Sequence, residues 1–448
     1  METRPRRFGR APPIRGGSDT PILPRVEINA GDTAWVLGAT ALVLFMTPGL
    51  ALFYGGMVRS KNVLGIMIQN FACIAVVSIV WALVAYTLAF GPDAGGNGLI
   101  GKLTFAGLAN GQDPVPGLEA LTIPPYAFAA FQMMFAVITT ALLTGSGADR
   151  LDFRGFLVFA TLWVTFVYAP LAHWVFSPGG WLFKRGVLDF AGGTVVEINS
   201  GMAGLALALV LRPRQGWPRE AMAPHNLPIA VIGAGILWFG WFGFNAGSAL
   251  GANFVAAHAL MTTQLAACAA MLGWLLVERL RTGKATTLGA VSGAVVGLVA
   301  ITPACGFVPA WAAIVIGFVA GMAGVLAAAA KFRLGYDDSL DVLAIHGVGG
   351  FIGTLAIGLF AATSVNPAVA HEGLFMGGGA HQLGVQALAV AVTMAWSFGM
   401  TLIIATLVQR TVGLRITPEQ EIRGLDTSLH AESAYDLGNV RSVGRMEP

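Results

Sequence analysis

Two side chains that can exchange a proton lie inside long apolar stretches of the sequence, Glu197 and His346. Glu197 follows Asp189 in Asp-Phe-Ala-Gly-Gly-Thr-Val-Val-Glu, and His346 follows Asp341 in Asp-Val-Leu-Ala-Ile-His. A carboxyl group at the centre of a membrane costs at least about 2.5 kcal/mol, so Glu197 needs a partner, a cavity or a proton. An imidazole titrates near neutrality and finds no hydrogen-bond partner in lipid. We expect the two groups to meet at a central pathway; the alternative is a protonated structural Glu197.

Aromatic residues form a second candidate site in two clusters. Phe131 and Phe135 are four residues apart, so they share one helix face, and Trp238 to Phe244 carries several rings just before Ser248. Stacked rings can bind a small cation through the cation–π interaction, although core packing also explains such clusters.

The elements that carry these groups must cross a membrane. The chain has 448 residues, 56% of them hydrophobic and only 11% charged, with a net charge of +3. Ordinary soluble domains are about one quarter charged, and the weak positive balance argues against a nucleic-acid-binding chain. Long charge-free intervals, each able to hold one or two stretches of roughly 20 apolar residues, predict an all-α polytopic protein. Eleven spans are expected near residues 34–54, 63–90, 124–145, 155–176, 190–211, 228–248, 254–277, 286–302, 307–330, 342–362 and 383–408.

Lys and Arg residues predict the orientation of the chain. Loops after odd-numbered spans carry twelve of them, whereas loops after even-numbered spans carry only Lys102, Lys184 and Arg185. The positive-inside rule then places the C-terminus in the cytoplasm and the N-terminus outside a cell membrane, the inner membrane in a bacterium. We expect a disordered N-terminal extension over residues 1–32, a transmembrane domain over 33–409 and a cytoplasmic tail over 410–448.

Spans 5 and 10 resemble each other in sequence. Each begins near an Asp, and in each a titratable group is followed by a Gly-rich stretch that permits close helix packing. This predicts an inverted repeat of spans 1–5 and 6–10 followed by a final helix, an arrangement that places substrate sites at the membrane midplane. The three cysteines, Cys73, Cys268 and Cys305, have no CxxC spacing, so no metal site, cofactor or disulfide framework is expected.

Several motifs carry a resemblance to a known family. They are Phe45-Met-Thr-Pro-Gly-Leu-Ala-Leu-Phe-Tyr54, Asp189-Phe-Ala-Gly-Gly-Thr-Val-Val, Trp241-Phe-Gly-Phe-Asn-Ala-Gly-Ser248, Thr302-Pro-Ala-Cys-Gly306, His346-Gly-Val-Gly-Gly350 and the tail segment Thr417-Pro-Glu-Gln-Glu-Ile-Arg-Gly-Leu-Asp426. From about residue 31 to 437 the chain resembles the Amt/Mep/Rh ammonium transporters, on the Amt/Mep side. The resemblance implies eleven spans, a homotrimer with one pore per subunit, ammonium as the substrate, and a tail on which a PII-type signal protein could act. It implies a transporter and not an enzyme.

The resemblance also assigns roles to individual residues. Phe131, Phe135, Phe176 and Ser248 match the external ammonium site, Phe131 and Phe244 the gate, Asp189 its structural support, and Glu197 and His346 the paired pore groups. Two positions depart from the family pattern. Glu197 stands where the first pore histidine is expected, as in fungal members. Phe176 takes the place of an external Trp, for which Trp174 or Trp181 could substitute.

These assignments predict that ammonium surrenders its proton to a buried acceptor and that ammonia crosses the pore, with proton co-transfer through the Glu197–His346 pair. Two alternatives remain open. The chain could be an ammonium sensor on the same scaffold, or an electroneutral channel for ammonia gas.

Overall fold

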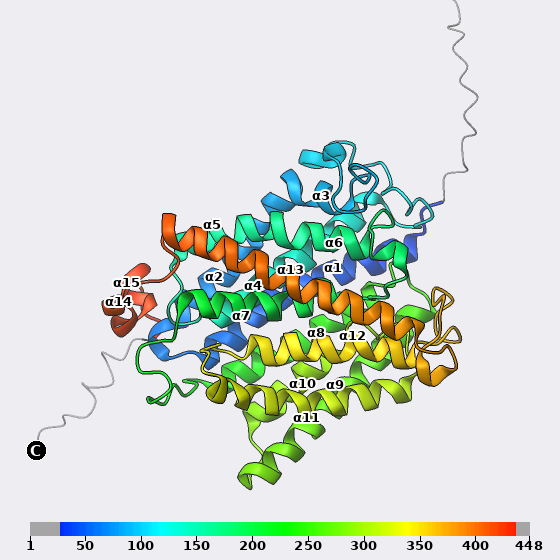
Figure 1. The fold of residues 1–448 in the computed structure, drawn as a ribbon. Coiled ribbons are helices and arrows are strands. Elements are labelled where there is room, and N and C mark those ends of the chain that lie inside the picture. The colour runs from blue at the N-terminus through cyan, green and yellow to red at the C-terminus, as the bar shows by residue number, and fades with distance from the viewer. Residues whose placement is uncertain (1–26, 436–448) are drawn as a thin grey trace, which may run out of the picture.

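The computed structural model describes residues 27–435, and these form an all-helical bundle (Figure 1). The first half contains α1 (Ala30–Met57), α2 (Val63–Val80) continued by η2 (Trp81–Ala85) and α3 (Tyr86–Phe90), α4 (Pro125–Gly147), α5 (Phe153–Trp163) continued by η4 (Val164–Tyr168) and α6 (Ala169–Phe176), and η6 (Gly193–Ile198) continued by α7 (Asn199–Leu211). The second half contains α8 (Leu227–Gly247), α9 (Phe254–Thr282), α10 (Thr287–Ile301), α11 (Ala310–Leu334), η7 (Leu343–Gly347) continued by α12 (Val348–Phe360), and α13 (His381–Thr411).

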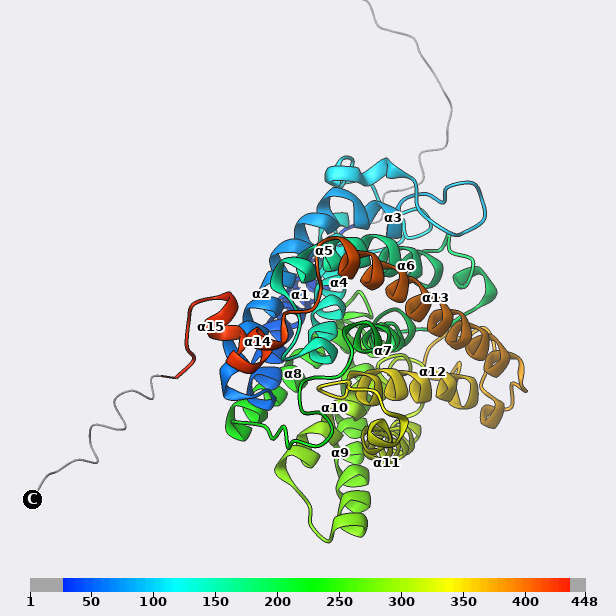
Figure 2. The same cartoon turned by 60° about the vertical axis from the view of Figure 1, so that its left-hand side comes forward.

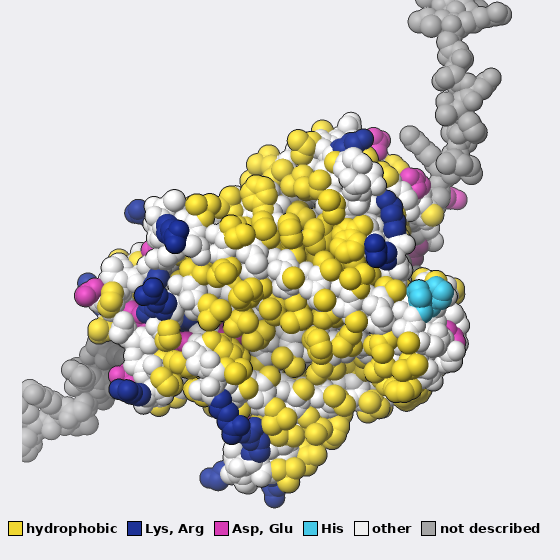
Figure 3. All heavy atoms as spheres, viewed as in Figure 1, with side chains coloured by type: hydrophobic (Ala, Val, Ile, Leu, Met, Phe, Trp, Pro, Cys, Tyr) yellow, Lys and Arg dark blue, Asp and Glu magenta, His cyan; other side chains and the backbone are white. Residues whose placement is uncertain are grey.

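Ten of these helices are long and apolar enough to cross a membrane, and the shorter apolar helix α10 has 15 residues. Together they correspond to the eleven predicted spans and confirm the predicted fold. Hydrophobic side chains cover the middle of the face shown in Figure 3, while Lys and Arg gather mostly toward its ends. The protein is therefore a multi-pass membrane protein. Residues 1–26 of the predicted N-terminal extension lie outside the described part of the chain.

The helices that carry Glu197 and His346 both begin with a π-helical segment, η6 and η7. π-Helical turns occur often at functional sites. Asp189 lies before η6, where its carboxylate accepts hydrogen bonds from the backbone N–H groups of Gly192 (2.8 Å), Gly193 (2.6 Å) and Thr194 (2.8 Å). Because this cap ends the extended backbone, the helix starts at Gly193, and not at residue 190 as expected.

Asp338, and not Asp341, is the counterpart of Asp189 at the start of η7. The Asp338 carboxylate accepts the backbone N–H of Leu343 at 2.8 Å. Asp341 instead forms an ion pair with Lys331 of α11, with 2.7 Å between Oδ1 and Nζ. Both helices of the pair thus begin at an aspartate that satisfies otherwise unpaired backbone donors.

Glycines let these two helices touch backbone to backbone. A Cβ atom on Gly201 would overlap with Gly347, the residue after His346, and a Cβ on Gly350 would lie 2.7 Å from the Cβ of Glu197. The two views in Figures 1 and 2 show α7 and α12 side by side in the centre of the bundle. This close crossing brings the side chains of Glu197 and His346 within reach of each other.

At one end of the bundle, buried charged residues join the loops between spans. Arg214 donates to Asp337 (Nη2–Oδ1, 2.8 Å) and to Asp149 (Nη1–Oδ2, 3.3 Å), and Arg59 also donates to Asp149 (2.9 Å). The guanidinium of the fully buried Arg150 donates to the carbonyl of Asp337 at 2.6 Å. One network therefore connects the loops that follow spans 1, 3, 5 and 9.

The tail packs onto the same end of the bundle through α14 (Pro418–Arg423) and α15 (Leu425–Leu429) (Figure 2). Lys61 donates to the carbonyl of Glu421 at 3.0 Å, and the backbone N–H of Gly65 donates to Asp426 at 2.8 Å. Glu421 is buried and forms an ion pair with Arg415 at 2.9 Å. The tail is thus bound to the loop between α1 and α2.

The helix crossing generates a stability prediction. Gly201→Ala should lower the unfolding temperature in detergent, because the added methyl group must displace the backbone of Gly347. Gly235→Ala on α8 is the matched control, since a Cβ at Gly235 meets no atom within 4 Å. The control should be neutral or stabilising, because Ala is about 1 kcal/mol better than Gly inside a helix. Equal unfolding temperatures for the two variants would contradict this role of Gly201.

The buried charge network generates a pH prediction. Burial alone would raise the pKa of Asp337, but hydrogen bonds and charge from Arg214, together with the charge of Arg150, lower that pKa below its ordinary value. A carboxyl with a lowered folded-state pKa stabilises the protein above its unfolded-state pKa, and the contribution is lost as the pH falls through the folded-state value.

Asp337→Asn should therefore lower the unfolding temperature strongly at neutral pH and progressively less in acid. Thermal unfolding of both proteins across a pH series measures the difference. Asp113→Asn, in an exposed loop position, is the control and should change little. A difference between wild type and Asp337→Asn that grows in acid would be incompatible with the ion pair stabilising the fold.

Candidate functional site

Glu197 and His346 form a buried hydrogen-bonded pair in the centre of the bundle. The Nδ1 atom of His346 lies 2.7 Å from Oε2 of Glu197, and the two residues are 4% and 0% exposed. The prediction that they meet is confirmed. A contact of this length needs one proton between nitrogen and oxygen: either the Nδ1–H of a neutral or protonated imidazole donates to a carboxylate, or a carboxylic acid donates to an unprotonated Nδ1.

The other carboxylate oxygen, Oε1 of Glu197, is buried and has no hydrogen-bond partner among the described residues. A buried polar atom without a partner is costly, so this oxygen is a place where a water molecule or a small polar solute gains a hydrogen bond. The pair therefore offers both a shared proton and an open acceptor.

A narrow cavity lies beside the pair. Its volume is about 10 Å³, which is room for roughly one water-sized molecule. Apart from Glu197 and His346, its wall consists of aliphatic and aromatic side chains: Met46, Leu50, Phe53, Ile138, Leu142, Val196, Leu237, Trp241, Phe244 and Val295. A hydrated ion does not fit into this space, whereas a small molecule that has lost its hydration shell does.

Three phenylalanine rings pack in a row beside this cavity, Phe131 edge-to-face against Phe135 and Phe135 tilted against Phe244. The ring centroids of Phe131 and Phe135 are 4.8 Å apart, and those of Phe135 and Phe244 are 4.3 Å apart. The expected gate paired Phe131 with Phe244, but the structure places Phe135 between them. The reason is that Phe131 packs against Gly247, which lies one turn beyond Phe244 on α8. A Cβ atom on Gly247 would lie 2.9 Å from the Phe131 ring. Phe244 lines the cavity, and Phe135 is the phenylalanine ring that packs against it.

Ser248 follows the last turn of α8, where its hydroxyl donates to the carbonyl of Phe244 at 2.8 Å. The hydroxyl proton is thus directed into the helix, which leaves the oxygen lone pairs available as an acceptor for a cation. Ser248 is half-buried, and Phe131 packs on the same helix end through Gly247. The serine and the ring stack therefore belong to one region of the molecule.

Phe176 is the last residue of α6 and is half-buried. Of the two alternatives to it, Trp174 is fixed: its indole N–H donates to the carbonyl of Leu99 at 2.7 Å, and its ring packs on Trp396 at 4.9 Å. Trp181 packs edge-on against Trp174, and Arg185 lies 5.4 Å from its ring. Both tryptophans are thus engaged in packing with other side chains.

Asp189 supports η6 and does not take part in the pair. Its two carboxylate oxygens accept three backbone N–H groups within 2.8 Å and the hydroxyl of Thr194 at 2.5 Å. These bonds occupy the lone pairs that a cation would need, so Asp189 holds the helix that positions Glu197.

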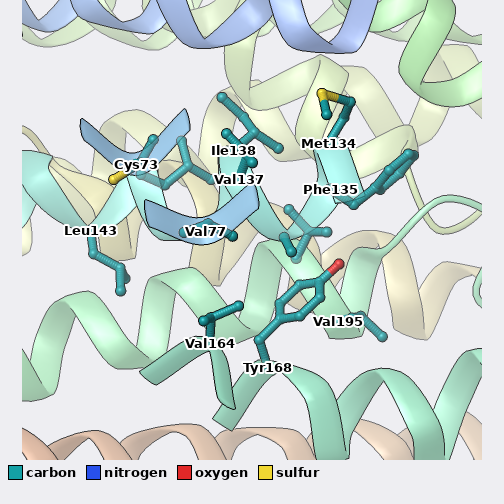
Figure 4. Packing of buried hydrophobic residues seen from close by; sticks show 14 of the residues in the cluster. Cys73, Val77, Met134, Phe135, Val137, Ile138, Leu143, Val164, Tyr168 and Val195 are labelled. Carbon is teal, nitrogen blue, oxygen red and sulfur yellow. The ribbon is translucent and has the colours of Figure 1, made fainter. Parts of the chain in front are cut away.

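Two residues near the site were not assigned a role from the sequence. Trp241 lines the cavity, and its indole N–H donates to Thr302 at 2.8 Å. Tyr168 is fully buried, and its hydroxyl has no partner among the described residues. Figure 4 shows this hydroxyl pointing to the side where Phe135 and Val195 lie. The aromatic cluster around Trp241 could have pointed to Trp241 from the sequence. No sequence pattern points to Tyr168.

Comparison with known proteins agrees with this architecture. Residues 34–435 match the model of the Ammonium Transporter Family. The chain is 51% identical over 434 residues to a protein named Ammonium transporter from Mycobacterium tuberculosis (strain ATCC 25618 / H37Rv), with 91% of each chain covered. It is also 51% identical over 408 residues to the Ammonium transporter of Bacillus subtilis (strain 168), covering 90% of this chain and 98% of the relative.

Solved structures show the same fold. The crystal structure of Mep2 from Saccharomyces cerevisiae matches with a TM-score of 0.80 at 38% identity, covering 88% of this chain and 89% of that one. A structure described as Sensor Amt Protein matches with a TM-score of 0.80 at 32% identity, covering 89% and 98%. With a family match over most of its length, relatives at half identity and the same helical architecture, this chain belongs to the Ammonium Transporter Family.

Proposed function

We propose that this protein transports ammonium by binding the cation at the outer aromatic site, removing its proton, and conducting ammonia past the Glu197–His346 pair. The observation that carries the proposal is the buried pair itself, 2.7 Å from nitrogen to oxygen, beside a cavity with room for one water-sized molecule. Family membership supports ammonium as the substrate.

Recruitment would use the ring stack and Ser248. The face of an aromatic ring attracts a cation, and the contribution reaches about 2 kcal/mol or more when both are desolvated. Phe131, Phe135 and Phe176 supply rings, and the Ser248 oxygen supplies an acceptor. Phe is a weaker cation–π partner than Trp, so a Phe at position 176 would weaken binding of the charged form.

Deprotonation follows from the cost of desolvation. Removing water from an ammonium ion inside an apolar cavity costs more than a few ring faces return. A molecule that leaves its proton behind crosses as neutral ammonia, which has the size for which the cavity has room. The proton goes to the buried pair, and the pair returns it on the far side of the membrane, so that one charge would accompany each ammonia.

Glu197 would stand at the position of the first pore histidine of the family. Two histidines are two neutral bases, whereas a carboxyl and an imidazole at 2.7 Å hold one proton jointly. The pair would therefore titrate as a unit, and its pH dependence would differ from that of a histidine pair.

We further propose that the protein lies in the cell membrane with its N-terminus outside and residues 410–448 in the cytoplasm. The docked α14 and α15 lie at the end of the bundle where the loops rich in Lys and Arg gather, which supports this orientation. As in the family, we expect a homotrimer. The tail contacts to Lys61 and Gly65 offer a route by which a PII-type signal protein could influence the bundle.

A sensor function is the second candidate, because the fold matches a protein described as Sensor Amt Protein with a TM-score of 0.80. A sensor would bind ammonium without conducting it, whereas a gas channel would conduct ammonia without charge. Electrical measurement separates these functions from coupled transport.

Variants of the pair test the mechanism. Glu197→His should retain uptake with a shifted pH profile, because a second base replaces the shared proton. Glu197→Ala, His346→Ala and Glu197→Gln should abolish or greatly impair charge-coupled uptake, since none of them leaves two groups that exchange a proton. Uptake of labelled methylammonium across a pH series measures this, with Glu119→Gln in an exposed loop position as the control. Identical pH profiles for wild type and Glu197→Ala would refute the mechanism.

Proteoliposomes test the function as a whole. Addition of ammonium to the wild-type protein should produce a current that is absent from protein-free vesicles and from Glu197→Gln vesicles. Ammonia flux without a current would show a gas channel, and binding of ammonium without flux would show a sensor.

A further inference from the structure

Two exposed histidines lie together on the surface, outside the pore. His371 lies in the segment of residues 361–380 between α12 and α13, and His381 is the first residue of α13. Their ring centroids are 4.1 Å apart at an angle of 48°, and both side chains are exposed. Figure 3 shows a histidine patch at the end of the bundle opposite the tail. None of the roles proposed above uses these residues.

The backbone that carries the two rings is held in place. The N–H of Gly373 donates to the carbonyl of Ala361 at 2.8 Å, and that of Gly378 donates to the carbonyl of Gly373 at 3.2 Å. The carboxylate of Glu372, next to His371, accepts the N–H and the hydroxyl of Thr363 at 3.2 and 2.6 Å. The loop therefore presents His371 to His381 from a defined position, and both rings are exposed.

The two adjacent rings offer imidazole nitrogens as possible metal ligands. Two imidazolium groups at this separation would repel each other. A neutral imidazole has one nitrogen with a free lone pair, and this is the form that binds metal ions.

We propose that His371 and His381 together bind a divalent transition-metal ion, Zn²⁺ or Cu²⁺. Imidazole nitrogen suits these ions, whereas Mg²⁺ and Ca²⁺ prefer oxygen ligands. Metal–nitrogen bonds of about 2.0–2.1 Å require two nitrogens a few ångströms apart, and side-chain rotation of adjacent exposed rings reaches that geometry. The described residues contain no group of three or more His, Cys, Asp or Glu suited to a metal, so water completes the shell and the ion exchanges readily.

The site would connect two elements of the second half of the bundle. A bound ion links the loop that follows α12 to the first turn of α13. α12 continues the η7 segment that contains His346. This inference stands apart from the transport mechanism, because metal binding requires only the two surface rings.

Calorimetric titration of the full-length, tag-free protein in detergent with Zn²⁺ tests the site. The wild type should bind one Zn²⁺ ion per chain at this site. Neither His371→Gln nor His381→Gln should bind that ion. His430→Gln and Cys268→Ser serve as controls, since each removes another potential ligand, and both should still bind it. Methylammonium uptake by the two histidine variants should match wild type, which shows that they are folded.

Electron paramagnetic resonance with Cu²⁺ gives a second readout. The wild-type spectrum should show two coordinated imidazole nitrogens, and each single variant should lose that signature. The proposal is overturned if wild-type protein binds no Zn²⁺ at this site, or if both single variants keep the same stoichiometry and the same Cu²⁺ spectrum.

Discussion

The hydrogen bond between His346 and Glu197 is the interaction on which the rest of the pore depends. Two ionisable groups inside an apolar bundle reduce the cost of their burial by hydrogen bonding to each other. Keeping them 2.7 Å apart requires that α7 and η7 cross in backbone contact at Gly201 and Gly347. Asp189 and Asp338 fix the starts of the two helices, so each aspartate contributes to the geometry of the pair without joining it.

The aromatic rings and the small cavity next to the pair limit the access of water to it. The row of packed rings Phe131, Phe135 and Phe244 adjoins a cavity of about 10 Å³. A ring stack attracts a cation, but a cavity of that size admits only a molecule without its hydration shell. In the proposed mechanism, these two features separate binding of the charged species from passage of the neutral one, and the Glu197–His346 pair accepts the proton.

The opposite end of the bundle has a different construction. There, Arg150, Arg214, Asp149 and Asp337 are buried as a network, and the tail is bound to the loop between α1 and α2 through Lys61. Asp338, the cap of the His346 helix, directly follows Asp337 of this network. The described tail and the pore are therefore joined through a short stretch of covalent chain and hydrogen bonds.

The sequence by itself determined the eleven spans, because a membrane tolerates few charges and the gaps between charged clusters mark the crossings. It also singled out Glu197 and His346, since an ionisable group within a span is costly and needs a partner, a cavity or a proton. It did not determine that Phe135, and not Phe131, stacks on Phe244, that Asp338 caps the second helix, or that Trp241 bonds to Thr302. These contacts depend on how helices distant in sequence cross, and residue types and spacing within one helix do not encode the rotation of its neighbour. Only the tertiary structure decided them.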